Sequence, residues 1–384
     1  MNDYLTIVGA SARAAAHSAR RAGYTVHAAD LFADVDLGTR CASSARVHRY
    51  AEFAPVIDGE QPGAWMYTGA LENHPALVER LARKRRLLGN AAAVLRRVRS
   101  PVAVAHSLAR AALPHMEVRR TSDGLPLDGT WLRKSLRSAG GADIEHWDGR
   151  ASTAGRSDRG YYFQRYSEGA PCSAVFVAAG DEARLIGVTR QLIGAAWTGA
   201  RGYQFCGSIG PMKISVQARD QLAALGSHLA REFQLQGLVG VDAVFDGDNV
   251  WPIEINPRYP ASAEVLEQAL GINVISLHVA ACLDARLPPI GLLTTPSPIA
   301  EIRGKAILFA SRRLLAPSCV RDFARQQWER PWPELADLPA VGTVIDPASP
   351  VLTVFAGGES ETEVLDRLKA KLADTRTQLE SGAA

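Results

Sequence analysis

Two acidic residues and an asparagine are spaced so that a β-hairpin would bring their side chains together. The turn sequence Asp246-Gly247-Asp248-Asn249 separates two apolar runs that are typical of paired strands. In such a hairpin Asp242 and Glu254 come roughly opposite each other, and alternation places Asn256 on the same face as Glu254. Two carboxylates this close repel unless a cation neutralises them, and a set of oxygen ligands suits magnesium. Asp242, Glu254 and Asn256 are therefore predicted to bind Mg2+.

A solvated hairpin with incidental acids is the alternative interpretation. It fits Asp246 and Asp248, because aspartate is a common turn residue. It fits Glu254 and Asn256 poorly, because apolar residues flank both of them. The metal site is therefore preferred for the strand residues, and the solvated role for the turn residues.

A lysine that ends an apolar strand precedes a small loop that contains glycine. The strand 131–134 ends on Lys134, and the loop 138–142 contains Gly140 and Gly141. Backbone N–H groups of such a loop can point at phosphate oxygens, while the lysine supplies a compact positive charge. Only six of the 43 basic residues are lysines, so a lysine at this position carries extra weight. An exposed lysine beside an ordinary loop is the alternative.

An aromatic strand runs into a polar turn over residues 161–169, with the sequence Tyr-Tyr-Phe-Gln-Arg-Tyr-Ser-Glu-Gly. A hinge of this kind can hydrogen-bond an adenine edge through its backbone while apolar walls stack on the ring. Taken by itself the pattern is more often an aromatic core strand, so both interpretations stay open.

Two arginines are candidates for stabilising the negative charge of an acyl phosphate. Arg190 lies in the sequence Gly-Val-Thr-Arg-Gln, and Arg258 follows Asn256 and Pro257. A surface salt bridge is an equally good explanation for each.

The elements that must position these residues follow from periodicity. The first 30 residues have the pattern strand, loop, helix, strand, which predicts a parallel sheet. The loop from Gly9 to Ala14 lacks the second and third glycines of a dinucleotide-binding turn, so a Rossmann-like fold without nucleotide is expected there. Further predicted strands cover 64–67 and alternate from about 113 to 245. Helices are predicted over 76–88, from about 91 onward, and over 101–112, 263–270, 274–283 and 361–379. The basic run 83–86 would lie on a solvated face of the first of these helices.

Composition places the chain among soluble globular proteins of about two to three domains. Of its 384 residues 47% are hydrophobic and 22% charged, and the formal net charge of +3 argues against a nucleic-acid surface. Five scattered cysteines without a CxxC pair fit reduced thiols, and no apolar run has the length of a membrane span. A cytoplasmic protein with no nucleic-acid or membrane partner is expected.

In this order the lysine strand, the glycine loop, the aromatic hinge and the Asp…Glu-x-Asn hairpin resemble the ATP-grasp superfamily. The lead-in over 88–114 is also similar, and 254–258 is the most specific stretch. The resemblance implies that ATP lies between two α+β lobes and that Mg2+, or Mn2+ in its place, lies on the hairpin. The residues that it assigns to the nucleotide are Lys134, Gly140, Gly141, Gln164, Tyr166, Ser167 and Glu168.

The resemblance also divides the chain into an α/β and an α+β part. It implies a Rossmann-like domain over 1–100, an ATP-grasp domain over 101–290 and a C-terminal extension over 291–384 that looks like the tail of biotin-carboxylase-like members. The segment 69–75 is similar to uncharacterised members associated with tetrahydromethanopterin-linked one-carbon metabolism. Two departures stand out: Ser100-Pro101 replaces a second phosphate lysine, and no ribose-binding glutamate follows the hinge unless Glu168 serves.

The implied activity is that of an ADP-forming ligase that activates a small-molecule carboxylate as an acyl phosphate and joins it to an amine. Arg258 and Arg190 are its candidate catalytic residues. A biotin-carboxylase-like enzyme that makes carboxyphosphate from bicarbonate is the alternative, and a nucleotide-binding protein without turnover is another. A homodimer is the common assembly among similar enzymes.

Overall fold

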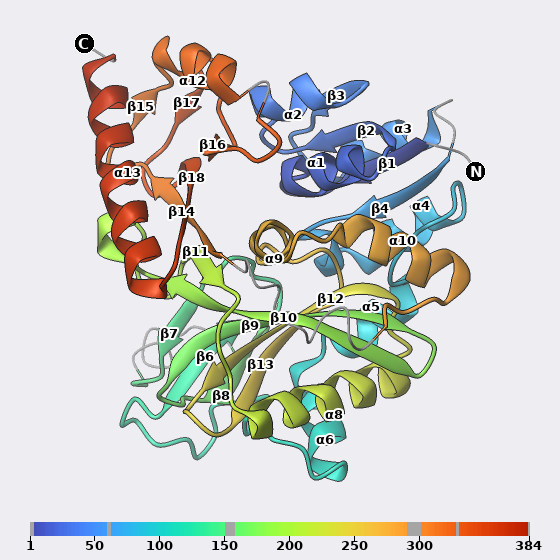
Figure 1. Ribbon diagram of the computed structural model, residues 1–384. Helices are drawn as coiled ribbons and strands as arrows, with labels where there is room; N and C mark the ends of the chain where they lie inside the picture. Colours follow the sequence, from blue (N-terminus) through green and yellow to red (C-terminus); the bar gives the residue numbers. More distant parts are fainter. Residues whose placement is uncertain (1–3, 60–62, 150–157, 290–300, 328–329, 383–384) are drawn as a thin grey trace.

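The computed structural model describes residues 4–59, 63–149, 158–289, 301–327 and 330–382 (Figure 1). Its first part is a parallel sheet in the strand order β3-β2-β1-β4, as the strand–helix–strand pattern predicts. Strand β1 is apolar and buried, which suits the centre of a sheet covered on both faces. The bounds in this part are β1 Tyr4–Val8, α1 Arg13–Arg21, β2 Thr25–Asp30, α2 Val35–Arg40, β3 Ser43–Arg46, η1 Tyr50–Glu52, α3 Phe53–Asp58, β4 Ala64–Tyr67, η2 Leu71–Asn73 and α4 Pro75–Ala82.

Helix α4 ends at Ala82, so the predicted helix over 76–88 is wrong in its second half. The basic run 83–86 lies outside any helix. The reason is a tertiary one: the amide of Leu88 donates to the carbonyl oxygen of Trp65 over 2.8 Å, and Trp65 donates to Arg86 over 2.9 Å. Pairing with the edge of β4 therefore overrides the helical periodicity.

Two short helices lead into the next part, as predicted. They are α5 Ala92–Val98 and α6 Pro101–Arg110. The hydroxyl of Ser100 accepts the amide of Ala103, and proline at the first helical position of α6 is preorganised for a helix start. The chain then forms an antiparallel sheet in the order β5-β8-β6-β7. Its strands are β5 Val118–Arg119, β6 Trp131–Ser135, β7 Ile144–His146 and β8 Tyr161–Arg165.

The largest sheet is antiparallel and has the order β13-β12-β9-β10-β11-β14-β18-β16. Strands from the predicted C-terminal extension thus complete the sheet of the predicted ATP-grasp domain. The predicted boundary between residues 290 and 291 lies outside the described residues. The strands of this sheet are β9 Ala170–Ala179, β10 Glu182–Ile193, β11 Phe205–Gly210, β12 Gly237–Phe245, β13 Val250–Asn256, β14 Ile302–Phe309, β16 Leu335–Ala336 and β18 Pro350–Gly358, and β15 Leu314–Leu315 pairs separately with β17 Val344–Ile345.

Helix α8, Val216–Phe233, packs on one face of this sheet (Figure 1). The expectation of strands throughout 113–245 missed this helix. Its apolar face, with Leu222, Leu225 and Leu229, joins a buried cluster with β9 and β12. The remaining elements are η3 Ala196–Thr198, α9 Ala263–Leu270, α10 Val274–Asp284, α12 Cys319–Gln327 and α13 Glu361–Ser381.

Helices α9 and α10 join the N-terminal sheet to the large sheet. They contribute to one buried cluster together with β1, α1, β9 and β12. By length and composition this pair could span a membrane, but it is bent by 108°, and no single helix of the described residues is long and apolar enough to do so. The buried cluster accounts for its apolar character.

Candidate functional site

A cavity of about 300 Å3 lies between the small sheet and the β12–β13 end of the large sheet. Side chains and loops from β6, β8, β12 and β13 line it together with the segment around Glu72. Of the predicted site residues, those that line the cavity are Lys134, Gly140, Gly141, Gln164, Tyr166, Ser167, Asp242, Glu254, Asn256 and Arg258. Arg190 and Glu168 do not line it.

The predicted hairpin has Asp242 directly opposite Glu254. Its register changes after this pair, because Ala243 is opposite Pro252 and Ile253 is the extra residue of a bulge. The bulge sets the acids opposite each other even though the turn alone would leave them one residue out of step. It also places Ile253 at the cavity, although strict alternation along the strand would turn it to the face opposite Glu254.

The amide groups of two neighbours hold the Asp242 carboxylate. Asn256 Nδ2 donates to Asp242 Oδ2 over 2.8 Å, and Gln191 Nε2 donates to Asp242 Oδ1 over 2.9 Å. Both oxygens of Asp242 therefore have a donor before any ligand arrives. Gln191 was not predicted as a site residue.

The two acids differ in their pKa. Burial and the nearby charge of Glu254 raise the pKa of Asp242 to about 6. Burial also acts to raise the pKa of Glu254, but the positive charges of Arg99 and Lys134 outweigh it and lower that pKa. Glu254 is thus ionised at neutral pH, and the repulsion between the two carboxylates is seen in the raised pKa of Asp242. A divalent cation between the two carboxylates would reduce that repulsion.

The donor set fits magnesium. The described residues contain no group of three or more His, Cys, Asp or Glu that could bind a metal by themselves. Two acids and an amide oxygen are instead the kind of partial oxygen set that Mg2+ completes with phosphate oxygens and water. Asp242, Glu254 and Asn256 are the residues that would hold it.

The stability of the metal-free protein should report the raised pKa of Asp242. The folded protein keeps a proton on Asp242 up to a pKa of about 6, whereas the unfolded chain releases it near 3.8. The folded state binds more protons between these values, so the free energy of unfolding falls as the pH rises through this window. Urea denaturation in EDTA should show that Asp242→Asn loses this fall. A pH-independent difference between the variant and the wild type would contradict the assignment.

Lys134 is only 5% exposed, which excludes the alternative of an exposed strand-end lysine. Its Nζ donates to Gln164 Oε1 over 3.0 Å, and Gln164 Nε2 donates to the carbonyl oxygen of Ile253 over 3.2 Å. Gln164 thus links β6, which carries the lysine, to the β12–β13 hairpin. Lys134 Nζ also lies 5.6 Å from the centroid of the Tyr162 ring, and its charge acts on Glu254. A buried ammonium in the cavity lining is suited to an anionic ligand.

The glycine loop is fastened to the segment that leads into β11. Gly140 accepts a hydrogen bond from the amide of Phe205 over 3.0 Å. Gly141 has a φ of +81°, and a Cβ there would lie 1.8 Å from the carbonyl oxygen of Tyr203. Glycine is therefore required at 141 both by the backbone conformation and by the close approach.

The hinge offers fewer backbone donors than its sequence indicates. The amides of Arg165 and Tyr166 donate to the carbonyl oxygens of Glu117 and Thr130, each over 2.9 Å. An adenine edge would therefore use the amide of Ser167 or a later residue. Glu168 is exposed and lies outside the cavity lining, so its position gives no support to a ribose-binding role.

The two candidate catalytic arginines are placed differently. Arg258 lines the cavity, and its guanidinium donates to Glu72 Oε1 over 3.0 Å and to Asn256 Oδ1 over 3.1 Å. Arg190 pairs instead with Glu361 at the start of α13, and its side chain is 46% exposed. The alternative of a salt bridge therefore describes Arg190, and its neighbour Gln191 faces the acids.

Two charged residues at this site, Arg99 and Glu72, were not predicted from the sequence. Arg99 Nη1 donates to Glu254 Oε1 over 2.5 Å and to the carbonyl oxygen of Ile255 over 3.2 Å. Glu72 is 3% exposed, and its Oε2 is buried without a hydrogen-bond partner in the described part of the chain. The position of Arg99 in the sequence could have indicated it, because Arg99 directly precedes Ser100-Pro101, where many ATP-grasp members carry a second phosphate-binding lysine.

Residues 103–262 match the family described as ATP-grasp domain. Among curated proteins, the carbamoyl phosphate synthase large chain of Clostridium acetobutylicum is 31% identical over 72 residues, which are 19% of this chain and 7% of that one. The same protein of Thermoplasma volcanium is 26% identical over 117 residues, or 30% and 11% of the two chains. The matched segment thus spans about a tenth of these relatives or less.

Solved structures share the fold over nearly the whole chain. Carboxyaminoimidazole ribonucleotide synthase from Aspergillus clavatus, complexed with ATP, has a TM-score of 0.70 at 15% identity, covering 99% of this chain and 100% of that one. Biotin carboxylase from Campylobacter jejuni, in a β,γ-ATP complex, has 0.67 at 14% identity, covering 94% and 89%. L-amino acid ligase from Bacillus licheniformis has 0.67 at 13% identity, covering 97% of each. Residues 103–262 are therefore an ATP-grasp domain, in a chain that has the ATP-grasp fold its motifs predict.

Proposed function

We propose that this protein is an ADP-forming ligase that uses ATP and Mg2+ to activate a small-molecule carboxylate as an acyl phosphate and joins it to an amine. The observation that carries the proposal is a single cavity lined by two opposed acids, Asp242 and Glu254, and by the cations Lys134 and Arg258. A cytoplasmic location and a homodimeric assembly stay predictions.

The side chains would supply position and charge, because phosphoryl transfer needs little covalent work from a protein. Lys134 and the loop at Gly140 would hold the nucleotide phosphates. Asp242, Glu254 and Asn256 would hold magnesium, which neutralises phosphate charge when bound. Arg258 would stabilise the charge of the acyl phosphate beside the hairpin.

A second candidate is the formation of carboxyphosphate from bicarbonate. It is favoured by the nature of the relatives, which include carbamoyl phosphate synthase large chains and biotin carboxylase. The two functions share the first step, attack of a carboxylate-type oxygen on the γ-phosphate, and differ in the identity of the acid. The same cavity serves either.

Product analysis tests the proposal. We expect ADP and phosphate rather than AMP and pyrophosphate, because formation of an acyl phosphate cleaves the bond between the β- and γ-phosphates of ATP. The purified protein would be incubated with Mg-ATP and a panel of carboxylates and amines, with and without bicarbonate, and the nucleotides separated by chromatography. Stoichiometric AMP would overturn the mechanism, and ADP release that needs bicarbonate but no amine would favour the second candidate.

We expect Arg99→Ala to raise the KM for ATP on the order of tenfold or more, because a charge-assisted contact near the phosphates is worth roughly 1.5–3 kcal/mol. Arg99→Lys should recover part of the loss. The matched control is Arg96→Ala in α5, the helix that ends just before Arg99, since the Arg96 side chain is 50% exposed and pairs with Glu79. Equal KM values for Arg99→Ala and Arg96→Ala would show that Arg99 does not replace the missing lysine.

A further inference from the structure

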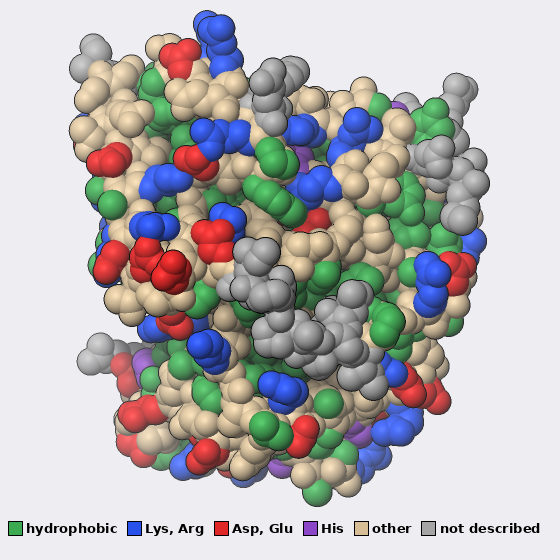
Figure 2. Space-filling view, viewed as in Figure 1, with side chains coloured by type: hydrophobic (Ala, Val, Ile, Leu, Met, Phe, Trp, Pro, Cys, Tyr) green, Lys and Arg blue, Asp and Glu red, His purple; other side chains and the backbone are tan. Residues whose placement is uncertain are grey.

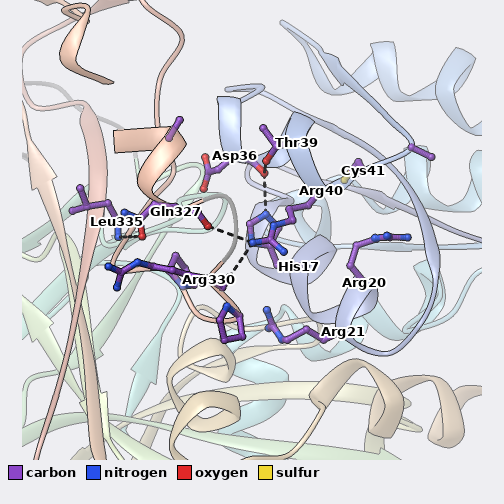
Figure 3. Close-up of a pocket in the computed structure, with 14 residues that line it drawn as sticks. His17, Arg20, Arg21, Asp36, Thr39, Arg40, Cys41, Gln327, Arg330 and Leu335 are labelled. Carbon is purple, nitrogen blue, oxygen red and sulfur yellow. Dashed lines mark hydrogen bonds between the residues drawn. The ribbon is translucent and has the colours of Figure 1, made fainter. Parts of the chain in front are cut away.

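A second cavity of about 560 Å3 lies between the N-terminal part and the C-terminal segment (Figure 3). One wall comes from α1 and α2 with the residues that follow, and the other from α12 and residues 330–335. The two walls are joined by Arg40, whose Nη2 donates to the carbonyl oxygen of Arg330 over 2.9 Å. This cavity shares no lining residue with the candidate nucleotide cavity.

Four arginines line this cavity: Arg20, Arg21, Arg40 and Arg330. Figure 2 shows basic side chains gathered on the surface over this junction. Arg21 pairs with Glu267, and Arg330 pairs with Glu334, which Lys371 also contacts. Arg20 is exposed and has no acidic partner in the described part of the chain, since its guanidinium donates only to the carbonyl oxygen of Tyr24.

The other ionisable groups of the lining do not cancel this charge. Asp36 accepts the amides of Asp337 and Leu338, each over 2.9 Å, and lies 3.7 Å from the guanidinium of Arg13. Its charge is therefore directed to the interior. Burial and the charge of Arg13 lower the pKa of His17 to about 3, so His17 is neutral. The charge of Arg20 therefore stays without an acidic partner among the described residues.

Helix dipoles explain the arginines only in part. Arg20 and Arg21 lie in the last turn of α1 and Arg40 in the last turn of α2, where basic residues are favourable. That preference does not account for Arg330, which belongs to the opposite wall, nor for a cavity between the walls. The apolar part of the lining (Ala324, Pro331, Pro333 and Leu335) adds a surface for a non-polar group.

We propose that this cavity binds an organic phosphate, a phosphate monoester carried on a sugar or ring of about nucleotide size or smaller. Guanidinium groups hold phosphate oxygens in a bidentate manner, and the volume lies in the usual range for small-molecule sites. The site goes beyond the proposed ligase function, because it is separate from the cavity with Asp242 and Glu254.

Isothermal titration calorimetry of the full chain tests the site, in HEPES buffer at constant ionic strength and without nucleotide. The probes are ribose 5-phosphate and glucose 6-phosphate, with ribose and citrate as comparisons. We expect saturable binding of at least one phosphate and none of ribose. The affinity should fall at least tenfold in Arg20→Gln and in Arg330→Gln, which keep the side-chain stems.

Two controls separate this site from its alternatives. Arg219→Gln removes an exposed arginine from α8, remote from the cavity lining, and should leave binding unchanged. Glu254→Gln should also leave it unchanged, so a failure of the ligase function would not affect this result. No saturable binding of any phosphate probe, binding insensitive to both Arg20→Gln and Arg330→Gln, or Arg20-dependent binding of citrate alone would each overturn the proposal.

Discussion

Glu254→Gln should abolish ADP release while the protein stays folded. Glutamine keeps the size of the side chain and most of its hydrogen bonding, so the substitution tests charge. Glu254 lies opposite Asp242, and the charges of Arg99 and Lys134 keep it ionised although it is half-buried. Without its charge the site should bind magnesium poorly, and the γ-phosphate would repel an incoming carboxylate.

The matched control for this experiment is Asp248→Asn, six positions away on the exposed turn of the same hairpin. The amide of Asp248 donates to Asp246, and asparagine suits this turn equally well. ADP release at saturating Mg-ATP and a melting curve would be measured for both variants. Near-normal turnover of Glu254→Gln, with Asp248→Asn also normal, would rule out the magnesium hairpin and the ligase proposal with it.

Lys134→Ala should lower the rate of ATP use on the order of a hundredfold or more. Removing a positioned charge at developing phosphate charge costs roughly 2.7–4 kcal/mol of transition-state stabilisation. The structure strengthens the expectation, because Lys134 is buried in the cavity lining and held by Gln164. Single-turnover measurement of ADP formation separates this loss from slow product release.

Lys84→Ala is the comparison for Lys134→Ala. Lys84 is exposed in the turn after α4, not on a helix as its sequence predicted. We expect a rate within a factor of about two of the wild type, because Lys84 does not line the cavity and an exposed substitution of this kind changes the free energy of unfolding by less than about 0.5 kcal/mol. Similar mild effects of the two substitutions would show that Lys134 and the loop at Gly140 do not hold the nucleotide phosphates.

Local patterns were enough to predict the centre of the candidate site. The hairpin, the lysine strand and the glycine loop each depend on residues within about 15 positions of one another, where turn chemistry and alternation set the geometry. These patterns brought Asp242, Glu254 and Asn256 together correctly. The bulge at Ile253 was beyond them, because a register change depends on the neighbouring strand as well.

Choices between adjacent residues needed the tertiary structure. Successive strand residues face opposite sides, so only one of Arg190 and Gln191 can face Asp242, and the sequence does not say which. The fold turns Gln191 to the acid and Arg190 to Glu361, 171 residues away. The charge of the arginine made Arg190 the better candidate from the sequence, but the orientation of β10 places Gln191 beside Asp242.

The sequence by itself determined the family motifs and the pairing of the two strands that brings Asp242 near Glu254. Only the tertiary structure decided which distant charges compensate the half-buried acids, as Arg99 does for Glu254 across 155 residues. It also decided that residues 83–86 lie outside the predicted helix, and that the walls lined by Arg20 and Arg330 enclose a cavity. The physical reason is that periodicity and turn chemistry act over a few residues, whereas ion pairs, strand edges and cavities depend on chain segments that meet only in the fold.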